Sequence, residues 1–88
     1  MSTGTSVRDR IRSFVLEKFP LARTRRVSDS DELLETGIVD SLGILDLVAF
    51  LESDFGLSVN DEDLVPEHFR SIECISDFTE QKHLERGA

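Results

Sequence analysis

The stretch ETGIVDSLG at residues 35–43 joins a turn to the start of a helix. Gly37 is a turn residue, and the pair Asp40-Ser41 favours a helix N-terminus. Residues 42–55 follow, and nine of these fourteen side chains are apolar. Ser41 therefore has two interpretations. It is a helix N-cap, or it is a chemical attachment point, because the unpaired amides and the dipole at a helix start stabilise an attached phosphate.

Length, charge and cysteine content exclude several classes of protein. The chain has 88 residues, which predicts a single domain over residues 1–88. A net charge of −8 disfavours nucleic acid and anionic membranes and favours basic protein surfaces as partners. The single cysteine, Cys74, fits a reducing compartment. With no signal sequence and no membrane-spanning run, we expect a cytoplasmic monomer.

Charge is unevenly distributed along the chain. Residues 1–26 hold seven of the ten basic side chains, whereas residues 27–88 hold sixteen of the eighteen acidic ones. Arg23, Arg25 and Arg26 form a basic cluster, which is either a solvated loop or a site for an acidic patch or a phosphate.

Capping residues and apolar periodicity predict an all-α bundle of three main helices and one short helix. Ser6, with Asp9 three residues later, caps a helix that Pro20 ends, and residues 21–40 form a long connection. The second main helix runs over residues 41–55, and Ser71 caps the last one. The short acidic helix begins after Asn60. We expect residues 1–5 and 84–88 to be loose.

The helix predicted at residues 41–55 carries more apolar side chains than one packed stripe needs. Leu42, Leu45 and Ala49 fall on a second face, with Asp46 and Asp54 beside it. Two interpretations stay open for this face: it packs against the bundle as a second buried side, or it is a docking surface with acidic edges.

The order of these elements resembles that of discrete acyl carrier proteins. The resemblance covers nearly the whole chain and rests on DSL at residues 40–42, FLESDFG at residues 50–56 and the acidic NDEDLVP at residues 60–66. It implies a 4′-phosphopantetheine arm on Ser41, with Asp40 and Leu42 as the residues that a phosphopantetheinyl transferase reads. It also implies an acyl- or aminoacyl-activating ligase and downstream transferases as partners, and no catalysis by the carrier itself.

The cargo implied by the resemblance is short or polar. Gly43 and Ile44 stand where many fatty-acid carriers have polar residues, and LLETGIVDSLG is closer to D-alanyl and other aminoacyl carriers. A cargo inside the bundle would lie between the second and third helices. The side chains expected to line that space are bulky, and close packing disfavours a long chain there: Leu47, Phe50, Leu51, Val65 and Phe69.

Other chemistries fit the sequence less well. A hydrolase elbow needs glycine two residues before the serine, where this chain has Val39. Asp29, Asp31 and Asp40 resemble the start of a calcium loop without its later ligands, so we expect no metal site. His68 is predicted to face solvent, and Cys74 to be a half-buried filler. A non-covalent helical adaptor, in which Ser41 is only a cap, remains the alternative to a carrier.

Overall fold

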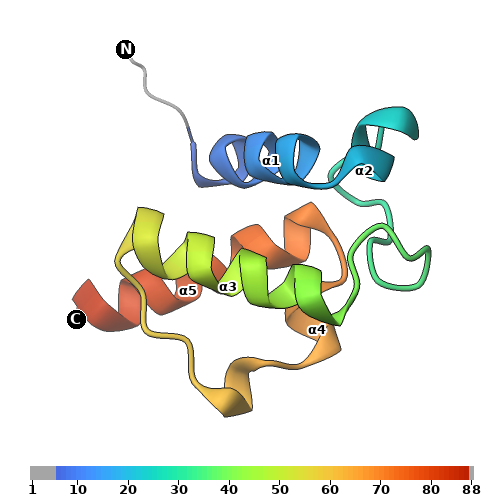
Figure 1. Cartoon of the computed structure of the whole chain (residues 1–88). Coiled ribbons are helices and arrows are strands. Elements are labelled where there is room, and N and C mark those ends of the chain that lie inside the picture. Colours follow the sequence, from blue (N-terminus) through green and yellow to red (C-terminus); the bar gives the residue numbers. More distant parts are fainter. Residues whose placement is uncertain (1–5, 88) are drawn as a thin grey trace.

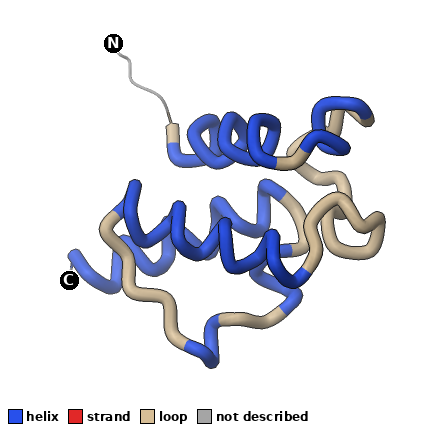
Figure 2. Tube along the Cα trace, in the orientation of Figure 1, coloured by secondary structure: helices blue, strands red, loops and turns tan. Residues whose placement is uncertain are grey.

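The structure is a computed structural model that describes residues 6–87, and within that range it is all-helical (Figures 1 and 2). The three main helices are α1 (Val7–Lys18), α3 (Ser41–Phe55) and α5 (Ile72–Gly87), as predicted. Three short helices join them: α2 (Pro20–Thr24), the 3₁₀ turn η1 (Asp61–Asp63) and α4 (Pro66–Phe69). The last helix continues through residues 84–87, whereas residues 1–5 and 88, also predicted to be loose, lie outside the described range.

Local capping signals correctly predicted the starts of α1 and α5 and the end of α3. The Ser6 hydroxyl accepts the N–H of Asp9 at 3.1 Å, and the Ser71 hydroxyl accepts the N–H of Cys74 at 3.1 Å. Gly56 ends α3 in the left-handed conformation with φ 67°. These caps satisfy amides or fix conformations within four residues of the sequence, which is why local patterns predict them.

Each of the two prolines is the first residue of a short helix. Pro20 stops α1 as expected, but it is also the first residue of α2, a helix that the sequence did not predict. Pro66 likewise opens α4, so η1 and α4 stand where one short helix was expected. Proline suits the first helical position because the missing N–H would be unpaired there.

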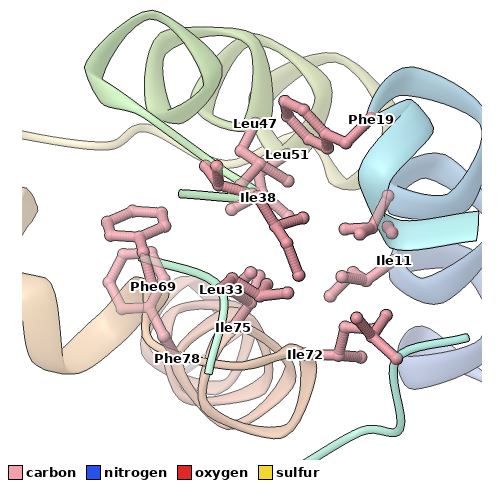
Figure 3. Close-up of a cluster of buried hydrophobic side chains, with 14 of the residues drawn as sticks. Ile11, Phe19, Leu33, Ile38, Leu47, Leu51, Phe69, Ile72, Ile75 and Phe78 are labelled. Carbon is pink, nitrogen blue, oxygen red and sulfur yellow. The ribbon is translucent and has the colours of Figure 1, made fainter. Parts of the chain in front are cut away.

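One hydrophobic core holds the three main helices together (Figure 3). The connection at residues 25–40 belongs to this core, because Leu33 is fully buried and its N–H donates to the Arg70 carbonyl at 2.8 Å. Val39 returns to the same place and donates its N–H to the Leu33 carbonyl at 3.0 Å. The loop that leads to α3 is therefore fixed by both apolar burial and backbone hydrogen bonds.

The segment from η1 to α4 is fastened to α5. Asp63 pairs with Lys82 at 3.0 Å, and both side chains are mostly buried. His68, predicted to face solvent, is half-buried instead: its ring stacks on Phe78 with centroids 4.4 Å apart, and Nδ1 lies 2.8 Å from the Asp63 carbonyl oxygen. The prediction for His68 was wrong because its aromatic partner lies ten residues away on another helix.

The Asp63–Lys82 pair predicts a pH-dependent contribution to stability. A hydrogen bond from the Asn60 backbone, and then the Lys82 ammonium, lower the pKa of Asp63 from its ordinary value of 3.8. A lowered folded-state pKa stabilises the protein above that ordinary value, and the contribution is lost as pH falls through the folded-state pKa. Lys82→Met should therefore cost about 1 kcal/mol at neutral pH and progressively less below pH 3.8, measured by urea unfolding.

Lys18→Met is the matched control, because Lys18 meets Asp46 at 3.8 Å with both side chains about half exposed. Its cost should be at most a few tenths of a kcal/mol. Equal costs for the two variants, or no pH dependence for Lys82→Met, would contradict the role given to the buried pair.

Candidate functional site

Asp40, and not Ser41, caps α3. The Asp40 carboxylate oxygen Oδ1 accepts the N–H of Gly43 at 2.8 Å, and its carbonyl accepts the N–H of Ile44 at 2.9 Å. Ser41 is the first residue inside the helix, so the interpretation of Ser41 as the N-cap was wrong. Asp and Ser are equally good caps, and the sequence could not decide which of two neighbours has the extended backbone that a cap needs.

The capping carboxylate leaves the Ser41 hydroxyl available for chemistry. Ser41 is exposed, and within the described chain no acceptor is found for the N–H groups of Ser41 and Leu42. These amides stand at the positive end of a fifteen-residue helix whose first turn holds no acidic side chain. The arrangement fits a phosphate ester on this hydroxyl.

The position of Ser41 depends on a close contact one turn into the helix. The aromatic ring of Phe19, at the end of α1, lies directly over Gly43: a Cβ built on Gly43 would be 2.7 Å from the ring and 3.0 Å from a methyl group of Val39. Ile38 and Val39 are themselves buried. The sequence showed Gly43 only as a departure from a family pattern, whereas the structure gives it a packing role.

Gly43→Ala should destabilise the protein. The added methyl group must displace the Phe19 ring, and overpacking of this kind costs about 1–3 kcal/mol. Alanine returns about 1 kcal/mol through its helix propensity, so we expect a net loss of about 1 kcal/mol in urea unfolding. Ser53→Ala, on the exposed side of the same helix, is the control and should change stability little.

A double-mutant cycle separates this contact from a general effect on α3. Phe19→Leu shortens the ring side chain, so the added cost of Gly43→Ala should shrink in that background. An unchanged cost in the Phe19→Leu background would show that another neighbour, and not Phe19, excludes the methyl group.

The second apolar face of α3 points to solvent. Leu42 is 72% exposed, Leu45 is 57% exposed, and Ala49 is also exposed. A second buried side, which was one of the two interpretations, is therefore excluded for these three residues. Asp46 and Asp54 lie on the flank toward α1, where Asp46 meets Lys18 at 3.8 Å and Asp54 meets Arg10 at 2.6 Å.

The side chains expected to line a cargo cavity fall into two groups. Leu47, Leu51 and Phe69 are fully buried in the core, and Val65 is half-buried. Phe50 does not belong with them, because its ring stacks on Phe14 of α1 with centroids 4.2 Å apart. Helix periodicity alone did not show that Phe50 faces α1 rather than the expected cargo space.

Asp29 takes part in ion pairs rather than in a metal site. Asp29, the first residue of the calcium-like pattern, pairs with Arg8 at 3.8 Å and Arg12 at 3.1 Å. Among the described side chains of residues 6–83, no group of three or more histidine, cysteine and acidic residues is arranged to hold a metal ion. Cys74 is half-buried, as predicted.

None of the described helices is long and apolar enough to cross a membrane.

Comparison with known proteins identifies the family. The family model described as "Phosphopantetheine attachment site" matches residues 9–79, which span α1 to α5. The chain belongs to the phosphopantetheine-binding carrier family. It is 29% identical over 82 residues to the acyl carrier protein of Thermotoga maritima, covering 93% of this chain and 98% of that one. It is 25% identical over 81 residues to the acyl carrier protein of Buchnera aphidicola subsp. Acyrthosiphon pisum, covering 92% and 98%.

Family membership sets the cofactor and the kind of activity. The prosthetic group is 4′-phosphopantetheine, which a phosphopantetheinyl transferase attaches, and the carrier performs no catalysis of its own. When attached, this group supplies a thiol that holds cargo as a thioester. The protein contributes binding, orientation and exposure of the attachment point. In the described structure, the exposed start of α3 is a place that suits such an arm.

Proposed function

We propose that Ser41 carries the 4′-phosphopantetheine arm. The observation that supports this most strongly is that Asp40 caps α3, which leaves an exposed, uncommitted hydroxyl at the first helical position. Asp40 and the exposed Leu42 flank it and are the residues that the transferase would read. A non-covalent adaptor has less support, because the cap role that it gives to Ser41 belongs to Asp40.

Ser41→Ala should abolish attachment of the arm and leave the fold intact. Since Asp40 makes the capping hydrogen bond, the change in stability should be below the roughly 1 kcal/mol of a lost cap. The measurement is the intact mass after incubation with coenzyme A and a phosphopantetheinyl transferase, with circular dichroism as the control for folding. An arm on the Ser41→Ala protein would overturn the assignment.

We also propose that the exposed apolar face of α3 is a docking surface for partner enzymes. Leu42, Leu45 and Ala49 form an exposed apolar strip beside the attachment point, and Asp46 and Asp54 border it toward α1. Such a strip suits weak, repeated contact with an acyl- or aminoacyl-activating ligase and with downstream transferases. Acidic edges would speed encounter with basic enzyme surfaces. We place this activity in the cytosol and expect a monomer.

The carrier then moves thioester-bound intermediates between these enzymes in a biosynthetic pathway. A tethered cargo reaches each docked active site at high effective concentration, so weak docking is sufficient. The relatives named above are acyl carrier proteins, which supports an acyl cargo. The stretch LLETGIVDSLG supports an aminoacyl or peptidyl cargo within the same mechanism.

We propose that the cargo is short or polar and stays outside the bundle. The hydrophobic core contains three of the expected lining residues, Leu47, Leu51 and Phe69. Each of these residues is fully buried. Interiors at this density admit a long acyl chain only if these side chains move apart. A short or polar group on the arm would stay in solvent at no such cost.

Amide chemical shifts test the location of the cargo. Holo protein loaded with an acetyl or alanyl group should show changes confined to residues around Ser41. The same protein loaded with a decanoyl group should show no further large shifts at Leu47, Leu51 or Phe69. Large shifts at these positions, together with slower hydrolysis of the decanoyl thioester, would show that the bundle encloses lipid and would favour a fatty-acyl carrier.

A further inference from the structure

Within the described side chains, three arginines have no acidic partner, whereas most of the other basic groups are paired. Arg8 and Arg12 meet Asp29, and Arg10, Lys18, Arg70 and Lys82 meet one carboxylate each. Arg23, Arg25 and Arg26 are exposed and form no ion pair with any carboxylate in the described part of the chain. We call these three residues the α2 arginine patch. Their charges are free to attract an external anionic group.

The backbone that presents the patch is fixed by the core. Ala22 and Val27, on either side of Arg25, are buried, and the N–H of Val27 donates to the Ala22 carbonyl at 3.2 Å. The Val27 carbonyl in turn accepts a hydrogen bond from Arg12 at 2.9 Å. Arg26 has φ 51°, a left-handed conformation that is uncommon for residues other than glycine and that the surrounding contacts must hold. A pre-ordered turn loses less entropy when it binds a partner.

The patch lies at the same end of the bundle as the candidate attachment point (Figure 1). Phe19 immediately precedes α2, and its ring touches Gly43, two residues after Ser41. Lys18 meets Asp46 on the second turn of α3. Leu21, the second residue of α2, is 44% exposed and adds an apolar side chain to this surface. An enzyme that covers the start of α3 therefore has α2 as its neighbour.

We propose that the α2 arginine patch is a second docking surface, which binds a carboxylate-bearing surface of the phosphopantetheinyl transferase. The proposal rests on the proposed attachment at Ser41, since that is what brings the transferase to this end. The carrier would then present negative edges on α3 and a positive patch on α2. Contacts of both signs fix the orientation of a complex and reject partners with the wrong charge pattern.

The test compares two variants that change the net charge equally. Arg23→Gln/Arg25→Gln removes two positive charges from the patch, and Ser58→Glu/Gln81→Glu adds two negative charges at exposed positions on the α3–α4 connection and on α5. Initial rates of arm transfer by the transferase of the same organism are measured with apo protein and coenzyme A varied separately. Leu45→Arg, in the proposed docking strip, serves as a positive control for weakened docking.

We expect KM for the apo protein to rise in the first variant and not in the second. Arg23→Gln/Arg25→Gln should raise KM for the apo protein about three- to ten-fold, with kcat and the KM for coenzyme A unchanged, because two rim contacts are lost. Ser58→Glu/Gln81→Glu should leave KM unchanged or lower it. Circular dichroism and the melting temperature establish that both variants fold.

Three results would overturn the proposal. A lower KM in both variants would show that the transferase reads only negative charge. A raised KM for coenzyme A instead of the apo protein would assign the arginines to the phosphates of that substrate. Concentration-dependent mass in sedimentation that the arginine variant abolishes would assign them to a second copy of this chain. Modification of the wild-type protein, and its loss in Ser41→Ala, test the attachment site separately from the patch.

Discussion

The contact between the Phe19 ring and Gly43 is the constraint on which the arrangement of this protein depends. It joins the end of α1 to the first turn of α3, and only a residue without a side chain allows the ring to approach so closely. Val39 completes the same contact from the loop side, so the loop, α1 and α3 meet at one point. The direction in which α3 starts, and with it the exposure of Ser41, follows from this packing.

The same junction explains how a thin core supports an exposed candidate site. The loop before α3 is anchored by three buried side chains, Leu33, Ile38 and Val39. The Asp40 carboxylate accepts the N–H of Gly43, so the Ser41 hydroxyl is not needed as the helix cap. The residues that stabilise the helix start are therefore different from the serine whose hydroxyl stays accessible. A carrier needs this separation, because its attachment point must be fixed in space and still be reached by several enzymes.

The sequence predicted those features that depend on near neighbours. The caps at Ser6 and Ser71 and the glycine that ends α3 all follow from spacings of a few residues. The sequence also placed Leu42 and Leu45 on a second face of α3, but only the structure showed that this face is exposed. Features that depend on distant partners were not predictable. His68 is half-buried because its ring stacks on Phe78 of another helix. The short helix α2 forms where Phe19 and Ala22 are anchored in the core.

The site itself was predictable in position but not in detail. The DSL triplet located Ser41 at the helix start, yet the division of roles between Asp40 and Ser41 depends on which residue adopts the extended backbone. The packing role of Gly43 required knowing that an aromatic ring from α1 lies over it. Neither fact changes the chemistry that the sequence indicated, but together they explain why this serine is exposed at the start of α3.

The most direct test of the central claim is a tandem mass spectrum of peptides from the holo protein. The chain has ten serines, several of them exposed, so the spectrum must distinguish among them. We predict one phosphopantetheine group, located on Ser41 alone. An arm on another serine such as Ser53 or Ser58, or a protein that stays unmodified with its cognate transferase, would contradict it.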